Sequence, residues 1–324
     1  MDLREVKWLR KQRIKARFAT KTRNKRSGGA ARKKQIYSGR KKGTKAYVLI
    51  APLTAGETAQ EKGKSVRDDR ETVHQIGGNA HGPLLSVIIP AMNEQRTIAA
   101  VVHECLRICP DAEVLVIVNG STDATASEAK RAGARVIQYA EALGHDGGRR
   151  AGAAVARGQV LLFTDADIKV PAEHLAPFVQ AVLEGVDVAL NDYNGPVTRN
   201  PVHPVVEAKH VLNSLLSRSD LGGASMTAVP HAISRRALEI IEASSLEIPP
   251  LAHAKAIVGG LRVQAVHHVP VGRLNAVRSK KRSEADPLSQ VVLQDHLEAI
   301  RWITDTCGVR GGFPDLQRVR SLTI

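Results

Sequence analysis

The feature that most constrains the fold is a regular alternation of short apolar runs and helical patterns between residues 84 and 164. Short apolar runs bounded by turn residues are typical of buried strands, and the segments between them have helical periodicity. Strands are predicted at Leu84–Pro90, Glu113–Val118, Arg135–Tyr139 and Gln159–Thr164, and helices at Glu94–Cys109, Asp123–Ala132 and Arg149–Arg157. This alternation predicts an α/β fold with a mostly parallel sheet that is covered by helices on both faces.

Polar residues directly follow three of the predicted strands. They are the segments 90–94 and 119–123 and the pair Asp165 and Asp167. Ligands of open parallel sheets bind outside the carboxyl ends of the strands. We therefore expect the three segments to converge on one crevice.

Asp165 and Asp167 are separated by one residue at the end of a buried strand. Mg²⁺ or Mn²⁺ prefers oxygen ligands and is commonly held by one or two carboxylates together with the phosphates of a substrate. The pair therefore suggests a site for a divalent cation bound to a diphosphate. Because a lone pair of this kind is more often part of a solvated turn, the interpretation depends on the neighbouring loops.

Two of those loops favour contact with a phosphate-bearing ligand. Residues 119–123 form a turn that runs into a helix start, where Ser121 or Asp123 can serve as the N-cap and backbone N–H groups point to the crevice. Residues 144–152 are predicted to be a glycine-rich loop that leads into a helix. Their backbone can approach a nucleotide closely, and Arg149 can meet a phosphate.

Four parts of the sequence, taken in order, resemble family 2 nucleotide-sugar glycosyltransferases of the GT-A fold. They are residues 86–94, residues 119–125, the loop 144–152, and the pair Asp165 and Asp167. The resemblance extends from Leu84 to about Val271. It implies a GT-A fold, a nucleotide-diphosphate sugar as donor, a hydroxyl acceptor, and Mg²⁺ or Mn²⁺ as cofactor.

The resemblance also implies roles for individual residues. The donor would be bound by Pro90, Asn93, Glu94, Asn119, Gly120, Ser121, Asp123, Gly144, Gly148 and Arg149, the acceptor by Gly222, Gly223 and Ser225, and the metal by Asp165 and Asp167. Family members usually have two aspartates where this chain has Val118 and Asn119. This difference keeps open the alternative of an inactive GT-A-like scaffold that binds nucleotides.

The catalytic base is left open by the resemblance. An inverting member would carry an acidic base near residues 246–251, where this chain offers only Glu247, and Asp295 is a further candidate. Retaining GT-A enzymes, such as the glucosyl-3-phosphoglycerate synthases, have no such base and complete the metal shell with a downstream histidine. In this chain that ligand would be His268 or its neighbour His267. His231 and His253 are the other histidine candidates.

The positive charge is concentrated at one end of the chain. Of the net charge of +15, residues 1–45 contribute 18 Lys and Arg against the two acids Asp2 and Glu5, so the rest of the chain is nearly neutral. We expect a basic, disordered extension that either stays solvated or binds an anionic membrane surface or another polyanion, with no specific nucleic acid as partner.

Three regions are predicted. Residues 1–82 form the basic extension and linker, residues 83–275 the GT-A domain, and residues 276–324 a helical segment packed on that domain. Three cysteines without metal-binding spacing, and no apolar run that could span a bilayer, suggest a cytoplasmic protein that is at most peripheral at the inner membrane face. A role in cell-envelope, spore-surface or related glycan synthesis is consistent with this location.

Overall fold

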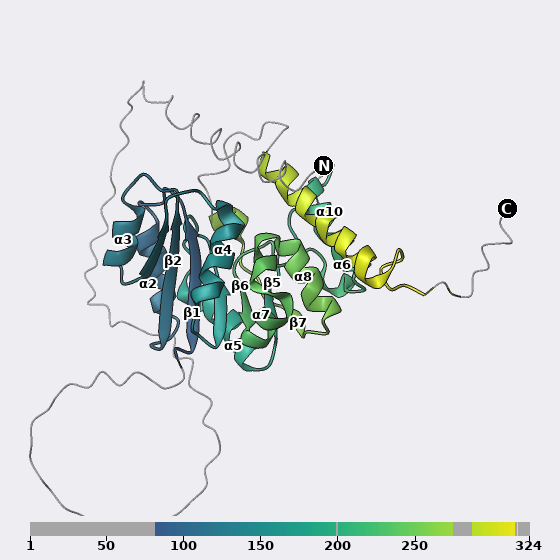
Figure 1. Cartoon of the computed structure of the whole chain (residues 1–324), viewed down its shortest axis with the longest axis horizontal. Coiled ribbons are helices and arrows are strands. Elements are labelled where there is room, and N and C mark those ends of the chain that lie inside the picture. The colour runs from purple at the N-terminus through teal and green to yellow at the C-terminus, as the bar shows by residue number, and fades with distance from the viewer. Residues whose placement is uncertain (1–81, 199, 275–286, 315, 317–324) are drawn as a thin grey trace, which may run out of the picture.

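The computed structural model describes residues 82–198, 200–274, 287–314 and 316 (Figure 1). The predictions for the basic extension fall on residues 1–81 and therefore lie outside the described residues. Within the described part of the chain, no helix has both the length and the apolar character needed to cross a membrane.

A seven-stranded sheet forms the centre of the fold, in the order β3-β2-β1-β4-β6-β5-β7. Its strands are β1 (Leu85–Ala91), β2 (Ala112–Asn119), β3 (Arg135–Tyr139), β4 (Val160–Phe163), β5 (Val188–Asn191), β6 (His231–Ser234) and β7 (Val263–His267). Only β6 runs antiparallel to its neighbours, β4 and β5. The predicted α/β fold with a mostly parallel sheet is confirmed.

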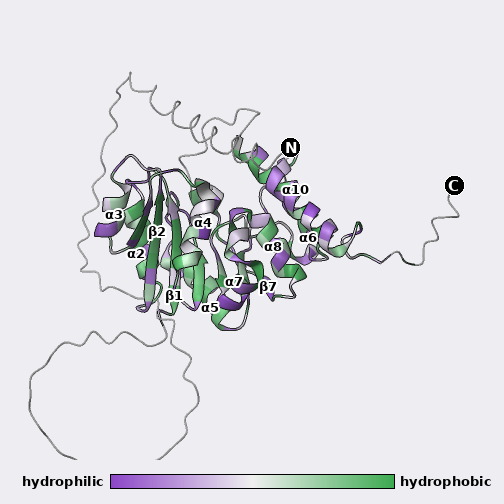
Figure 2. Cartoon of the chain, viewed as in Figure 1, coloured by the Kyte–Doolittle hydropathy of each residue, from purple (hydrophilic) through white to green (hydrophobic). Residues whose placement is uncertain are grey.

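Helices cover both faces of this sheet (Figure 1). The helices of the described residues are α2 (Ile98–Leu106), α3 (Thr125–Arg131), α4 (Gly144–Val155), α5 (Ala172–Leu183), α6 (Pro204–Leu215), α7 (Arg235–Ile241), α8 (Pro249–Val258), α9 (Val271–Leu274) and α10 (Pro287–Cys307), with 3₁₀ turns η1 (Ser219–Leu221) and η2 (Ala243–Glu247). The core between sheet and helices is apolar, and the strands carry the most hydrophobic colours in Figure 2.

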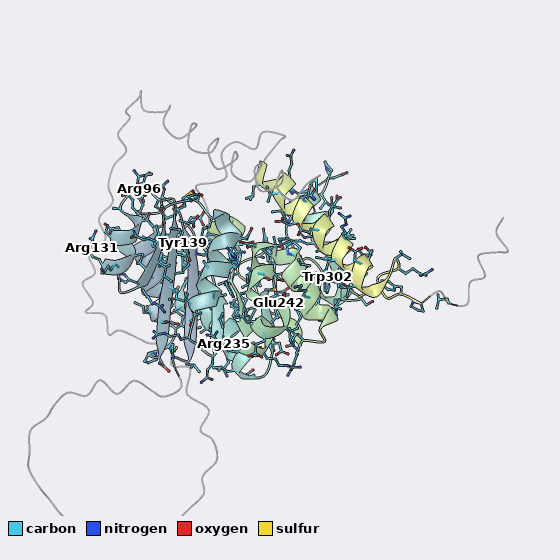
Figure 3. The ribbon with its side chains drawn as sticks, in the orientation of Figure 1. Arg96, Arg131, Tyr139, Arg235, Glu242 and Trp302 are labelled. Atoms are coloured by element: carbon cyan, nitrogen blue, oxygen red, sulfur yellow. The ribbon has the colours of Figure 1, made fainter. Side chains whose placement is uncertain are left out.

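Alternate residues of each central strand belong to different cores, as the period of a strand requires. In β1, Val87 and Ile89 pack with α2, α3 and α5, whereas Ile88 packs on the opposite face with residues of α4, α7 and α8. A third apolar cluster joins α6, α8 and α10 through Leu212, Ala254 and other side chains. Trp302 of α10, labelled in Figure 3, packs at the border of this cluster.

The glycine-rich segment is helical from Gly144, so the predicted helix at Arg149–Arg157 is confirmed in its position, but the prediction of a loop before it, at residues 144–148, is wrong. The glycine-rich segment forms the larger part of α4. A Cβ at Gly148 would lie 2.9 Å from Pro90 Cβ, and one at Gly152 would lie 2.4 Å from Ile88 Cγ2. These glycines therefore allow α4 to lie unusually close to the sheet, and this packing outweighs their poor helix propensity.

The tight contact between α4 and β1 predicts the effect of one added methyl group. Gly152→Ala is expected to lower the free energy of unfolding by about 1–3 kcal/mol, because Ile88 is fully buried and overpacking costs that much in a dense core. Urea denaturation measures this. Ala154→Leu adds more volume on the exposed side of the same helix and should change stability by less than about 0.5 kcal/mol. Equal stability of Gly152→Ala and the wild-type protein would contradict the packing argument.

Helix α2 begins later than the predicted Glu94. The N–H groups of Thr97 and Ile98 donate to the Glu94 carbonyl at 3.1 and 3.0 Å, so the residues before Ile98 form a turn. Asn93, just before this turn, has a φ of 56°, a left-handed conformation that asparagine tolerates better than most residues. The chain thus bends sharply after β1 before the helix starts.

Candidate functional site

The loops after β1 and β2 interlock at the carboxyl edge of the sheet. Asn93 N–H donates to Ser121 Oγ at 3.0 Å, and Thr122 N–H donates to Asn93 Oδ1 at 2.8 Å. Glu94 N–H donates to Thr125 Oγ1 at 2.8 Å. In Figure 3, Tyr139 at the end of β3 marks the carboxyl edge of the sheet, and Arg235, directly after β6, marks the opposite edge. The structure thus brings the first two predicted donor-binding segments together.

Asn119 connects these loops to the start of α4. Its side chain is 2% exposed, and its Oδ1 accepts a hydrogen bond of 3.2 Å from Leu143 N–H, while Nδ2 donates to the carbonyls of Ala91 and Ile117 at 3.4 Å. Gly120 has a φ of 63°, and a Cβ there would lie 3.0 Å from Ala142 N. Asn119 therefore has a structural role, and its binding of a donor stays a prediction.

Arg149 forms a buried ion-pair cluster with two carboxylates. Its Nη2 lies 3.1 Å from Asp165 Oδ1 and its Nη1 lies 3.3 Å from Asp146 Oδ1. The exposed fractions are 3% for Arg149 and 8% for Asp165. The sequence interpretation assigned Arg149 to a phosphate and did not include Asp146. A helical assignment of residues 144–155 would have revealed Asp146, because residues three apart share a helix face.

His231 is a buried, neutral neighbour of this cluster. It is 1% exposed, its ring lies 4.9 Å from that of Phe163 in a stacked arrangement, and its Nδ1 donates to the Ala228 carbonyl at 2.9 Å. Burial, followed by the positive charge of Arg149, lowers the pKa of His231 to about 3. His231 therefore supplies packing and no positive charge near Asp165.

The turn at Gly222 and Gly223 is held by two asparagines. A Cβ at Gly222, whose φ is 53°, would lie 2.2 Å from Asn194 Oδ1, and this oxygen accepts the Gly223 N–H at 2.7 Å. From the other side, Asn213 Nδ2 donates to the carbonyls of Gly222 and Ala224 at 2.8 and 2.9 Å. Both positions require glycine, and the turn has one defined conformation.

His253 fixes the orientation of Asn213. Its Nε2 donates to Asn213 Oδ1 at 2.7 Å, and burial as the main cause, with smaller effects of His296 and Arg218, lowers the pKa of His253 to about 3. The 0% exposed His253 thus acts as a structural support below the turn. Ser225 Oγ, on the same turn, is buried and has no hydrogen-bond partner among the residues that the structure describes.

His268 has a ring nitrogen available for a ligand. Its Nδ1 lies 2.5 Å from the Asp192 carbonyl, which can only accept, so the ring proton sits on Nδ1 and Nε2 keeps its lone pair. Metal-ligating histidines have this arrangement, in which the other ring nitrogen donates to a carbonyl or a carboxylate. In the described ranges no group of three or more His, Cys, Asp and Glu side chains is close enough to hold a metal. Asp165, Asp167 and His268 therefore form no preassembled three-ligand site there.

The candidate bases have structural partners or buried positions. Glu247 Oε1 lies 2.9 Å from Arg150 Nε and 3.7 Å from the Cβ position of Gly147, so Glu247 lies beside α4. Asp295 is 2% exposed on α10. Glu247 is thus already bound to an arginine through one carboxylate oxygen, and Asp295 is almost completely enclosed by protein.

Glu104 of α2 holds the end of the segment that follows Asp167. Its carboxylate accepts the Ala172 N–H at 3.2 Å and lies 3.3 Å from Lys169 Nζ. Partial burial raises the pKa of Glu104, but the hydrogen bonds from Ala172, Lys169 and Arg107 outweigh burial and lower it. Sequence reasoning missed Glu104, since nothing in its local pattern distinguishes it from a surface carboxylate.

Comparisons with known proteins agree with this arrangement. Residues 86–239 match the family model described as glycosyl transferase family 2. The chain is 40% identical to dolichyl-phosphate beta-glucosyltransferase from Drosophila melanogaster over 99 aligned residues. The alignment covers 26% of this chain and 30% of the relative. The chain is 28% identical to glucosyl-3-phosphoglycerate synthase from Mycolicibacterium paratuberculosis over 177 aligned residues. This alignment covers 46% of this chain and 53% of the relative. The chain thus spans about half or less of the length of these curated relatives.

Solved structures show the same fold. The crystal structure of glucosyl-3-phosphoglycerate synthase from M. tuberculosis matches with a TM-score of 0.51 and 24% identity, over 72% of this chain and 83% of that one. A complex of the same enzyme with Mn²⁺, UDP and glucosyl-3-phosphoglycerate matches with a TM-score of 0.50 and 22% identity, over 76% and 88% of the two chains. Residues 86–239 of this chain are thus similar to glycosyl transferase family 2 in sequence, and the fold is similar to that of glucosyl-3-phosphoglycerate synthase.

Proposed function

We propose that this protein is a metal-dependent glycosyltransferase that moves a hexose from a nucleotide-diphosphate donor to a hydroxyl acceptor. The observation that carries the proposal is the convergence of the β1 and β2 loops, the start of α4 and Asp165 at one edge of the sheet. The match of residues 86–239 to glycosyl transferase family 2, and the fold shared with an enzyme solved in complex with UDP, support it. A UDP-sugar is the donor that these similarities favour.

The donor half of the site is formed by residues from the first half of the domain. We assign Pro90, Asn93, Glu94, Asn119, Gly120, Ser121, Asp123, Gly144, Gly148 and Arg149 to it. Gly148 keeps α4 close to Pro90 and Asn119. Arg149, paired with Asp165, holds that carboxylate in place and so acts on the donor through Asp165. This arrangement orients the reactive groups before the donor binds.

The residues present fit a divalent cation held jointly by protein and donor. Asp167 and the Nε2 atom of His268 would be its ligands, with Asp165 beside them, and diphosphate oxygens would complete the shell. Mg²⁺ or Mn²⁺, when bound, neutralises the charge of the leaving diphosphate. The absence of a three-ligand cluster in the described residues agrees with a site that needs the donor.

The acceptor hydroxyl would lie over the turn that includes Gly222, Gly223 and Ser225. The buried Ser225 Oγ, which has no protein partner in the described ranges, is available to bind an acceptor group. Glu247 is the candidate base for an inverting reaction. Its ion pair with Arg150 favours a second candidate, a retaining reaction like that of the glucosyl-3-phosphoglycerate synthases, which needs no such base.

The cellular role is proposed from sequence features outside this site. We place the enzyme in cell-envelope, spore-surface or related glycan synthesis, with residues 83–275 as catalytic domain and residues 276–324 as a helical segment. The 18 basic residues among positions 1–45 would attach it to an anionic membrane surface or another polyanion. This attachment rests on charge alone.

Thermal unfolding of the full chain with nucleotides tests the donor site. UDP with Mn²⁺, at about 100 times its Kd, should stabilise the protein by about 2.7 kcal/mol. UMP lacks the second phosphate and should give no shift that depends on Mn²⁺. Stabilisation by UDP that persists unchanged in EDTA would fit the inactive nucleotide-binding scaffold, and no shift with UDP, GDP or ADP would contradict the transferase proposal.

A further inference from the structure

Two histidines distant in sequence are joined by a direct contact between their ring nitrogens. Nδ1 of His174 lies 2.9 Å from Nε2 of His267. The ring centroids are 5.2 Å apart and the ring planes are inclined by only 26°. The distance between the centroids is about the nitrogen–nitrogen distance plus one ring radius on each side. The two rings therefore face each other with their edges. The geometry is that of an N–H···N hydrogen bond, in which one ring donates and the other accepts.

The contact joins the two chain segments that carry the candidate metal ligands. His174 lies in the first turn of α5, seven residues after Asp167, and His267 is the last residue of β7, directly before His268. The edge of Phe178, one helical turn further along α5, packs against His267 with 6.1 Å between ring centroids. The first turn of α5 and the end of β7 are therefore fixed to each other.

The adjacent histidines of β7 make contacts with different elements. His267 contacts α5, whereas His268 Nδ1 bonds to the Asp192 carbonyl in the segment after β5. The backbone makes a further contact between these segments, since the N–H of Asp192, directly after β5, donates to the His267 carbonyl at 2.9 Å. A change in the position of His267 would therefore move the peptide that carries His268.

We propose that His174 and His267 are positioning residues that set His268 relative to Asp167, an inference that rests on the proposed metal-dependent transfer. The segment after Asp167 is held on its other side by Glu104, which binds Lys169 and the Ala172 N–H. With both contacts made, the segment between Asp167 and α5 is connected to α2 on one side and to β7 on the other. Removing the ring contact releases this constraint while both candidate ligands remain.

Four variants of the full chain test the proposal. His174→Phe keeps an aromatic ring but removes the nitrogen, and His174→Asn places an amide atom where Nδ1 stands. His267→Gln makes the corresponding replacement for Nε2. His103→Phe on α2 is the matched control, because the His103 side chain is exposed and contacts neither His174 nor His267 among the described residues. Mn²⁺ binding is followed by the EPR signal of free Mn²⁺ in the presence of saturating UDP.

We expect His174→Phe to weaken Mn²⁺ binding by about 10- to 100-fold, as loss of an outer-shell partner does at other metal sites, while UDP binding in EDTA stays unchanged. His174→Asn and His267→Gln should recover most of the affinity, and His103→Phe should match the wild-type protein. Unchanged Mn²⁺ affinity in His174→Phe would overturn the positioning role. An equal loss of UDP binding in EDTA would also overturn it, because it would indicate a general disturbance of the fold.

The proposed function can fail separately. Wild-type protein that binds no Mn²⁺ in the presence of UDP would contradict both the metal site and its positioning by the histidine pair. Wild-type protein that binds Mn²⁺ with UDP, together with an unaffected His174→Phe, would contradict only the positioning role.

Discussion

Asp167→Asn is expected to remove the Mn²⁺-dependent stabilisation by UDP and to lower kcat/KM for sugar transfer by about a thousandfold. Charge neutralisation at the leaving group is worth several kcal/mol, and about 1.4 kcal/mol corresponds to a tenfold change in rate. The substitution keeps the size of the side chain but removes the negative charge that a cation requires. Thermal unfolding with UDP and Mn²⁺, followed by an assay of donor turnover, measures both effects.

The same isosteric change at an exposed position is the control for this loss. Asp305 lies on the surface of α10, so Asp305→Asn should bind UDP and Mn²⁺ like the wild-type protein. Asp167→Asn should also retain the unfolding temperature of the wild-type protein in EDTA, since Asp167 is not fully buried. Full Mn²⁺-dependent binding of UDP by Asp167→Asn would contradict the assignment of Asp167 as a ligand.

Arg149→Met is expected to lower the free energy of unfolding by about 3–5 kcal/mol, the usual effect of removing one partner of a buried ion pair. The replacement leaves Asp165, 8% exposed, beside an apolar side chain and also removes the partner of Asp146. Donor binding should fall as well, because Asp165 loses the contact that orients it. Urea denaturation gives the stability, and titration with UDP gives the affinity.

An exposed arginine pair provides the comparison for this variant. Arg131, whose side chain is 69% exposed, pairs with Glu128 on α3, so Arg131→Met should change stability by less than about 1 kcal/mol. The double variant Arg149→Met, Asp165→Asn should be more stable than Arg149→Met alone, since it no longer buries the carboxylate charge that has lost Arg149. Additive effects in this double-mutant cycle would show that Arg149 and Asp165 are not energetically coupled.

The convergence of the segments that follow the strands was predictable because its signals are local. Asn93, Ser121 and Asp165 each follow an apolar strand directly, so strand order and the edge rule of parallel sheets bring them together. The structure confirms the sheet and the contact between Asn93 and Ser121. For turn residues that directly follow such strands, the sequence predicts which other turns lie nearby without any knowledge of side-chain packing.

Contacts between distant side chains could not be read from the sequence. The glycines at positions 144, 147 and 148 indicated a loop before residue 149, whereas the helix α4 already begins at Gly144 and its Gly148 lies close to Pro90. His253 and Asn213 are 40 residues apart, and their hydrogen bond depends on how α6 and α8 pack. Helix propensity is a property of the local sequence, whereas these contacts form only when two elements pack against each other.

The antiparallel direction of β6 has a consequence for how this domain can diversify. The chain leaves the carboxyl edge after Asn191 and returns to the same edge at His231, so α6 and the glycine turn belong to a single excursion of residues 192–230. Asn191 Nδ2 bonds to the Val229 carbonyl at 2.9 Å and closes the base of this excursion. Under the proposed function, sequence changes within this excursion can alter acceptor recognition while the β1 and β2 loops stay the same, as long as the packing of α6 on α8 and α10 is kept.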